Sequence, residues 1–179
     1  MKFEEIEGDL IELSLQGKFD VCVQGCNCQN TQGAGLAPQM VEAFGTDTFP
    51  MELTGKGDYN KLGQIDYEPF FVQDGEAIGF HEGQLVAALS PSKYKKLYVV
   101  NCYTQFNYGR NHADGDKAPL DFAALTLCLK KINHIFKGKH IGLPVIGGGL
   151  GGGNPILIVK IMKELLPDCD VTIVHYKKS

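Results

Sequence analysis

The stretch Ile141-Gly-Leu-Pro-Val-Ile-Gly-Gly-Gly-Leu-Gly-Gly-Gly-Asn-Pro155 predicts a strand, a glycine loop and the start of a helix, in that order. Its first six residues are mostly apolar and β-branched, which is typical of a buried strand. Asn154-Pro155 is a common way for a helix to begin. Glycine allows positive φ and a close approach of the backbone to a ligand, and the unpaired N–H groups of a helix N-terminus point at whatever lies there. This combination is suited to binding a phosphate.

A second glycine-containing loop is predicted near the front of the chain. Residues 19–23 indicate a short buried strand, which leads into a polar segment ending in Gly33-Ala34-Gly35. Residues 35–44 then have the apolar spacing of a helix, which Gly45 ends. Two such loops that face one ligand could each hold one phosphate, so we expect a diphosphate.

The composition indicates one globular domain that spans residues 1–179. Of the 179 residues, 44% are hydrophobic and 21% are charged, values that are ordinary for a globular protein of this length. The formal net charge of -4 argues against broad nucleic-acid binding, which usually shows a basic footprint. It does not argue against a phosphate ligand, because backbone N–H groups can bind an anion without Lys or Arg.

Nothing in the chain indicates a membrane, a metal or a cofactor. No apolar run approaches the roughly 18 residues of a membrane helix, and the first residues do not form a signal peptide. Of the six cysteines, only Cys26 and Cys28 are close-spaced, and a zinc site usually needs a second pair. We therefore expect a cytoplasmic monomer with reduced, mostly buried thiols, no metal site and no cofactor.

Alternating strands and helices predict a three-layer α-β-α sandwich with a mixed, largely parallel sheet. A helix is expected after Pro119, with an apolar stripe of Leu120, Ala124, Leu127, Ile132 and Ile135. A last helix is marked by apolar residues between 158 and 165. The predicted strands cover residues 2–7, 19–23, 84–90, 96–103, 141–146 and 171–175, with possible strands at 62–67 and 70–73. A polar loop is expected at 107–116.

Two common nucleotide folds fit the glycine loop poorly. Gly147, Gly149 and Gly152 formally satisfy the G-x-G-x-x-G pattern, but a Rossmann unit places that pattern early and continues with further βα units. Here one helix and one strand remain, and that strand ends in His175 instead of an acid for a ribose. No Gly-Lys-Ser/Thr follows either glycine run, so a Walker phosphate loop is excluded as well.

Three segments, in this order and over nearly the whole chain, resemble the macrodomain family. They are Gly8-Asp9-Leu10, the run from Gly25-Cys-Asn27 to Gly33-Ala-Gly-Leu-Ala37, and the run from Leu143 to Gly152. Cys-Asn-Cys before the first loop resembles the yeast-type ADP-ribose-1″-phosphate phosphatases and their phage and bacterial relatives. Asn101-x-Tyr103-Thr-Gln-x-x-Tyr108-Gly is similar to phage members. The resemblance implies the macrodomain fold and ADP-ribose or a derivative as the small-molecule ligand.

The resemblance also implies which residues bind the ligand. Asp9 matches the acid that accepts a hydrogen bond from the adenine amino group, and the N–H of Leu10 would reach a ring nitrogen. Asn27 matches the residue at the distal ribose. Read alone, Asp9 could instead cap a helix or stabilise a tight turn, and Asn27 could bind its own loop. The backbone that would wrap the diphosphate comprises Gly33, Ala34, Gly35, Leu36, Ile146, Gly147, Gly148, Gly149, Leu150 and Gly151.

The departures from the family concern catalysis. Gly151 stands where many macrodomains have an aromatic residue, Gln24 stands where the yeast-type phosphatases have a His, and Asn154 stands where relatives have an Asp. Asn154 before a proline is also a natural helix N-cap. Asn27 and Asn154 remain the catalytic candidates, and other possible groups are Cys26, His81, His112, Asp114 and Asp116. We expect hydrolysis of ADP-ribose-1″-phosphate or of an ADP-ribosyl bond; the alternative is a module that binds ADP-ribose or an NAD-derived metabolite without catalysis.

Overall fold

The computed structural model describes residues 1–108, 119–149 and 151–177. One seven-stranded sheet runs through it in the order β1-β7-β6-β2-β5-β3-β4. The strands are β1 (Phe3–Gly8), β2 (Val21–Asn27), β3 (Ile65–Gln73), β4 (Glu76–Gly79), β5 (Lys95–Gln105), β6 (His140–Leu143) and β7 (Asp170–Tyr176). Strands β1, β7, β6, β2 and β5 are parallel, whereas β3 and β4 are antiparallel to their neighbours. The predicted mixed, largely parallel sheet is therefore confirmed.

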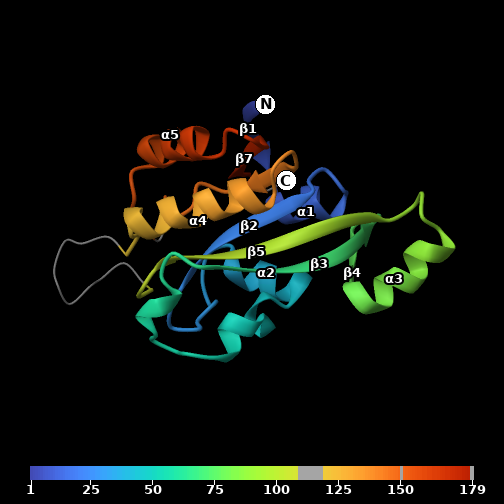
Figure 1. The fold of residues 1–179 in the computed structure, drawn as a ribbon, viewed down its shortest axis with the longest axis horizontal. Coiled ribbons are helices and arrows are strands. Elements are labelled where there is room, and N and C mark those ends of the chain that lie inside the picture. The colour runs from blue at the N-terminus through green and yellow to red at the C-terminus, as the bar shows by residue number, and fades with distance from the viewer. Residues whose placement is uncertain (109–118, 150, 178–179) are drawn as a thin grey trace.

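Helices cover both faces of this sheet (Figure 1). They are α1 (Leu10–Leu15), α2 (Ala37–Phe44), α3 (Phe80–Leu89), α4 (Phe122–Ile135) and α5 (Pro155–Leu165). Short 3-10 turns occupy Thr46–Thr48, Pro50–Leu53 and Tyr59–Lys61. The apolar faces of α4 and α5 pack on one side of the central strands, and those of α1 and α2 pack on the other. The layers are thus α-β-α, as the sequence predicted.

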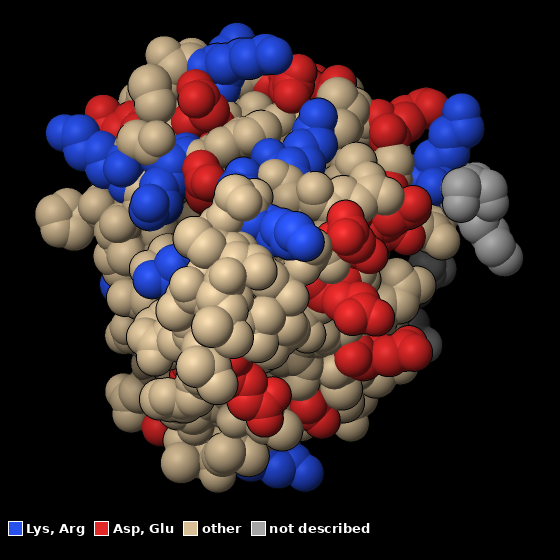
Figure 2. Space-filling model, turned by 90° about the vertical axis from the view of Figure 1, so that its right-hand side faces the viewer, with Lys and Arg blue, Asp and Glu red and all other residues tan. Residues whose placement is uncertain are grey.

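The segment 84–90 was predicted as a strand, and this was wrong, because it lies in α3. A short apolar run has no periodicity that separates a strand from a helix. In the structure, Gly83 lies so close to Phe71 of β3 that an added Cβ would be 2.5 Å from Cδ2 of that ring. Helix α3 packs against β3 through this glycine and leaves Leu85 and Leu89 exposed at that end of the molecule. Figure 2 shows this end, where acidic and basic side chains surround an uncharged surface.

The helix expected after Pro119 begins later, at Phe122. Asp121 is its N-cap, with Oδ1 accepting from the N–H of Ala124 at 2.9 Å. The predicted apolar stripe is wrong in part, since Leu127 and Ile135 are 50% and 42% exposed. The face that packs on the sheet consists of Ala124, Leu125, Cys128, Leu129 and Ile132.

Two strand boundaries also differ from the prediction. The two possible strands at 62–67 and 70–73 form one strand, β3, which pairs with β5 without interruption at Pro69. Strand β6 ends at Leu143 instead of residue 146, because Pro144 has no N–H with which to continue the ladder. The chain leaves the sheet at that proline and enters the glycine loop.

The structure bears out the predicted state of the cysteines. All six are buried, and none forms a disulfide. No helix in the described part of the chain is long and apolar enough to cross a membrane.

Candidate functional site

A cleft lies at the carboxyl ends of the parallel strands, where the two glycine loops meet. It consists of two adjoining cavities of about 560 and 590 Å³. Both cavities are bordered by Gly35, Leu36, Pro144, Val145 and Gly149. Ligands of open α/β sheets usually bind in this position, so the cleft is the candidate site.

Internal hydrogen bonds shape the second glycine loop. The N–H of Gly153 donates to the carbonyl of Gly147 at 2.8 Å, and the N–H of Gly152 donates to the carbonyl of Gly149 at 3.0 Å. The φ angles of Gly147 and Gly152 are 74° and 69°, values that favour glycine. A Cβ at Gly151 would lie 2.6 Å from Cα of Gly147. These glycines are therefore required to close the loop tightly.

Three N–H groups of this loop remain available for a ligand. Those of Gly147, Gly149 and Gly151 donate to no acceptor in the described part of the chain, and all three residues line the cleft. Around Gly149, no described atom lies within 4 Å of an added Cβ, so this residue borders open space.

The first glycine loop offers a second set of N–H groups. Gly33, Ala34, Gly35 and Leu36 line the cleft, and their N–H groups find no acceptor among the described residues. This loop leads into α2, whose N-cap, Leu36, supplies no side-chain hydrogen bond. The positive end of the helix dipole is therefore directed at the cleft without a capping side chain.

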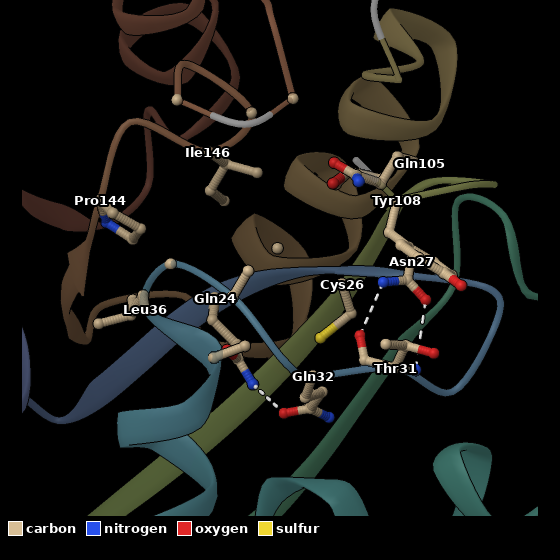
Figure 3. Close-up of a pocket in the computed structure, with 18 of the residues that line it drawn as sticks. Gln24, Cys26, Asn27, Thr31, Gln32, Leu36, Gln105, Tyr108, Pro144 and Ile146 are labelled. Atoms are coloured by element: carbon tan, nitrogen blue, oxygen red, sulfur yellow. Dashed lines mark hydrogen bonds between the residues drawn. The ribbon is translucent and has the colours of Figure 1, made fainter. Parts of the chain in front are cut away.

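Asn27 lies at the end of β2 on the wall of the cavity of about 560 Å³ between the two glycine loops, the loop cavity (Figure 3). Its Nδ2 donates to the carbonyl of Thr31 at 2.7 Å, and its Oδ1 accepts from the N–H of Gln29 at 2.9 Å. Asn27 thus organises the turn that leads to the first glycine loop. This is the structural role that the sequence analysis gave as the alternative to a ligand contact. One proton of its Nδ2 remains free to meet a ligand, so a contact with a distal ribose stays a prediction.

Asp9 is the N-cap of α1. Its Oδ1 accepts from the N–H groups of Ile11 and Glu12, both at 3.0 Å. Its Oδ2 takes no hydrogen bond from the described residues. The neighbouring Leu10 borders the second cavity, and its N–H has no acceptor in the described part of the chain. The predicted contact with adenine remains untested.

Asn154 has the capping role that its position suggested. Its Oδ1 accepts from the N–H groups of Ile156 at 3.0 Å and Leu157 at 3.4 Å, at the start of α5. Of the predicted site residues, Asp9, Gly148 and Asn154 are not among those that border the cleft. Leu150 lies outside the described residues. The geometry therefore favours a structural role for Asn154 over the predicted catalytic one.

Several cleft residues were missed by the sequence analysis. Thr31, Gln32, Thr104, Gln105 and Tyr108 border the loop cavity. The second cavity is bordered by Gln39, Val174 and Tyr176. The signal that could have found Thr104, Gln105 and Tyr176 is their place at the carboxyl ends of β5 and β7, since these ends meet at one edge of the sheet.

Charged side chains are scarce in the cleft. Among the described residues that border the cleft, the ionisable ones are His175, Cys26 and two tyrosines. Nε2 of His175 lies 2.9 Å from Oε1 of Glu5. Burial raises the pKa of the Cys26 thiol well above its usual 9.0, so this thiol stays protonated and is a poor nucleophile.

The other candidate catalytic groups do not border the cleft in the described part of the chain. His81 lies in α3 at the far end of the sheet, and His112, Asp114 and Asp116 lie outside the described residues. No group of three or more His, Cys, Asp or Glu in the described ranges could hold a metal ion.

The sequence matches no protein-family model. It is 30% identical over 178 residues to an uncharacterized 17.5 kDa protein of enterobacteria phage T4, and the match covers 96% of this chain and 95% of that protein. The chain therefore belongs to the same family as this phage protein.

Comparison with solved structures identifies the fold. The chain is similar to the macrodomain of Thermus aquaticus DarG, with a TM-score of 0.58 and 18% identity over 97% of both chains. It is also similar to Thermosipho africanus DarTG, solved in complex with ADP-ribose, with a TM-score of 0.65 and 16% identity; the match covers 99% of this chain and 42% of that one. The protein thus has the macrodomain fold, as its three sequence segments indicated.

Proposed function

We propose that the cleft binds ADP-ribose or a derivative of it. The observation that carries this proposal is the set of N–H groups without acceptors that two glycine loops direct at one cleft. These groups form an uncharged anion site with one set of N–H groups from each loop, which suits the two phosphates of a diphosphate. Binding of ADP-ribose by a solved protein of the same fold adds support.

The two ends of the cleft differ in a way that fits the two ends of this ligand. The second cavity is bordered by apolar side chains of Leu10, Leu36, Val145 and Val174 and by the ring of Tyr176. An adenine base would pack there, with Asp9 and the N–H of Leu10 as its polar partners. The loop cavity carries the amides of Gln24, Asn27 and Gln105. Amides both donate and accept hydrogen bonds, which suits the hydroxyl groups of a distal ribose.

Calorimetry with ADP-ribose, ADP, AMP, NAD and ADP-ribose-1″-phosphate tests the binding proposal. We expect ADP-ribose to bind more tightly than ADP, and ADP more tightly than AMP, because each step removes one part of the ligand that the cleft contacts. Absence of binding to every one of these ligands would overturn the proposal.

We further propose that the chain slowly hydrolyses ADP-ribose-1″-phosphate to ADP-ribose and phosphate. Gly151 carries no aromatic side chain of the kind that many macrodomains have at this position, so it does not itself block a phosphate on the anomeric carbon, although Tyr108 borders the same cavity. The described residues of this cavity include no carboxylate, His or Lys that could act as a base. Stabilisation by loop N–H groups and orientation of the substrate can still supply several kcal/mol. Hydrolysis of an ADP-ribosyl bond is the second reaction to test.

Phosphate release from ADP-ribose-1″-phosphate separates an enzyme from a binding module. We expect a slow rate that Asn27→Ala lowers at least about tenfold, equivalent to about 1.4 kcal/mol of transition-state stabilisation. A metal chelator should leave the rate unchanged. Affinity for ADP, which lacks the distal ribose, serves as the control that the loop of the variant is intact. Tight binding with no phosphate release above background over hours would favour the non-catalytic binding module.

A further inference from the structure

A main-chain carbonyl fixes the orientation of two amides, one buried behind the cleft (Asn101) and one half-buried at its wall (Gln32). The carbonyl oxygen of Thr46 accepts from Nδ2 of Asn101 at 3.0 Å and from Nε2 of Gln32 at 3.1 Å. Since a carbonyl oxygen can only accept, both amides must turn their NH2 groups toward Thr46. Their oxygen atoms then point away from it.

These two oxygen atoms in turn fix Gln24. Nε2 of Gln24 donates to Oδ1 of Asn101 at 2.8 Å and to Oε1 of Gln32 at 3.1 Å (Figure 3 shows the second bond). The hydroxyl of Thr46 also donates to Oε1 of Gln32, at 2.7 Å, in keeping with the orientation that the Thr46 carbonyl imposes. Both protons of the Gln24 amide are therefore used inside the protein. A flipped Gln24 would place its oxygen against two other oxygens.

The oxygen of Gln24 is left for the cleft. Gln24 borders the loop cavity, and no described residue donates a hydrogen bond to its Oε1. This atom is not among the fully buried side-chain oxygens that lack a partner in the described part of the chain. The buried Oγ1 of Thr104, on the opposite face of the sheet, also has no partner among the described residues, and Thr104 borders the same cavity. The wall of the cavity therefore includes a fixed acceptor at Gln24.

We propose that Gln24 is a specificity residue that accepts a hydrogen bond from a hydroxyl group of the ligand's distal sugar. The inference rests on the proposed function and adds to it the residue and the direction of the bond. Asn101 and Gln32 act as positioning residues, because they hold the Gln24 amide in one orientation. Asn101 does not itself border the cleft. A ligand that carries only acceptors at this point would meet the Gln24 oxygen unfavourably.

The ratio of the affinities for ADP-ribose and ADP tests this role. Gln24→Met keeps the size of the side chain and removes the acceptor, so it should weaken ADP-ribose binding about tenfold and leave ADP binding unchanged. Asn101→Leu removes the acceptor that holds Nε2 of Gln24 and should lower the same ratio without contacting the ligand. Gln39→Met, the same exchange in the other cavity, should change both affinities equally. An unchanged ratio in folded Gln24→Met protein overturns the role of Gln24 and leaves the proposed function standing.

A second measurement uses the unaltered protein and so does not depend on the folding of a variant. ADP-ribose analogues in which one distal hydroxyl is replaced by fluorine keep an acceptor at that position and lose the donor. One of these analogues should bind about tenfold more weakly than ADP-ribose. If all of these analogues bind as tightly as ADP-ribose, the role of Gln24 is overturned. Binding of ADP would in that case still support the proposed function. Loss of binding to ADP itself would overturn both.

Discussion

Asp9 caps α1 with one carboxylate oxygen and leaves the other for the adenine contact that we propose. Its Oδ1 caps α1, and its Oδ2 has no partner among the described residues. The cap places the N–H of Leu10 at the edge of the second cavity. The helix cap and the proposed adenine site are therefore built by the same two residues.

Asp9→Asn should separate these two roles. Asn is as good an N-cap as Asp, so the free energy of unfolding should stay within a few tenths of a kcal/mol, whereas Asp9→Ala should lower it by about 1 kcal/mol. If Oδ1 remains the cap, Asn presents an NH2 group to the adenine amino group, and both variants should lose about 1.5–3 kcal/mol of ADP-ribose binding. Calorimetry and denaturant unfolding check both values. Wild-type affinity in Asp9→Asn would leave Asp9 with the cap alone.

At the scale of elements, the anion site that we propose between the two glycine loops has no basic side chains. The described residues that border the cleft include no Lys or Arg. The glycines of the second loop fall into two groups, because Gly149 borders open space whereas Gly151 packs on Gly147. A substitution at each position should therefore have a different effect.

Gly149→Val should abolish ADP-ribose binding and leave the melting temperature nearly unchanged, because the new side chain enters the cleft and meets no described atom of the protein. Gly151→Ala should lower both the affinity and the melting temperature, since its Cβ would lie 2.7 Å from the carbonyl oxygen of Gly147. Thermal unfolding with and without ligand measures both. Strong salt dependence of binding that traces to one or two lysines would contradict the role of the backbone.

Asn154→Ala tests the cap of the helix that follows this loop. Loss of the two hydrogen bonds to the first turn of α5 should cost about 1 kcal/mol of unfolding free energy. Phosphate release, measured per mole of folded protein, should change little. A fall in rate that exceeds the fall in stability would restore the catalytic role predicted for Asn154.

At the scale of the whole molecule, the sheet is flanked by a buried polar region beside β3 and β5. Glu52 is 6% exposed, its Oε1 accepts from the hydroxyl of Tyr103 at 3.2 Å, and its Oε2 has no partner among the described residues. Burial raises the pKa of Glu52 above its usual 4.5, and burial likewise raises the pKa of Asp66. The buried Lys61 opposes the shift at both carboxyl groups.

The sign of this shift makes the fold less stable as the pH rises. A carboxyl group with a raised pKa binds its proton more tightly in the folded state than in the unfolded state. The free energy of unfolding therefore declines as the pH increases from about the usual pKa of 4.5 through the raised pKa of the folded protein. Glu52→Gln keeps an acceptor for Tyr103 and removes the charge. The variant should be more stable than the wild type at pH 8, and this difference should shrink toward pH 4. Denaturant unfolding at both pH values checks it, and a variant that is less stable at pH 8 would contradict the argument.

Short-range patterns in the sequence determined the order of the main elements and the two loops. Glycine has few substitutes where φ is positive, as at Gly147, and apolar periodicity marks long buried segments such as β5, β7 and α5. The α/β sandwich and the place of the cleft followed from these local signals, whereas the macrodomain fold was implied by the resemblance of three segments to that family. They failed at residues 84–90, where the contact between Gly83 and Phe71 decides for a helix.

The tertiary structure alone decided how the polar side chains are used. Asn101 is 55 residues from Thr46 and 77 residues from Gln24. No local pattern therefore shows that the carbonyl of Thr46 orients the amide of Asn101, which in turn orients the amide of Gln24. Likewise, Asp9 and Asn154 could be read from the sequence as ligand contacts or as caps, and the geometry of their first turns identified the caps. The physical reason is that a hydrogen bond depends on the direction of its donor, and that direction is fixed only when distant strands come together.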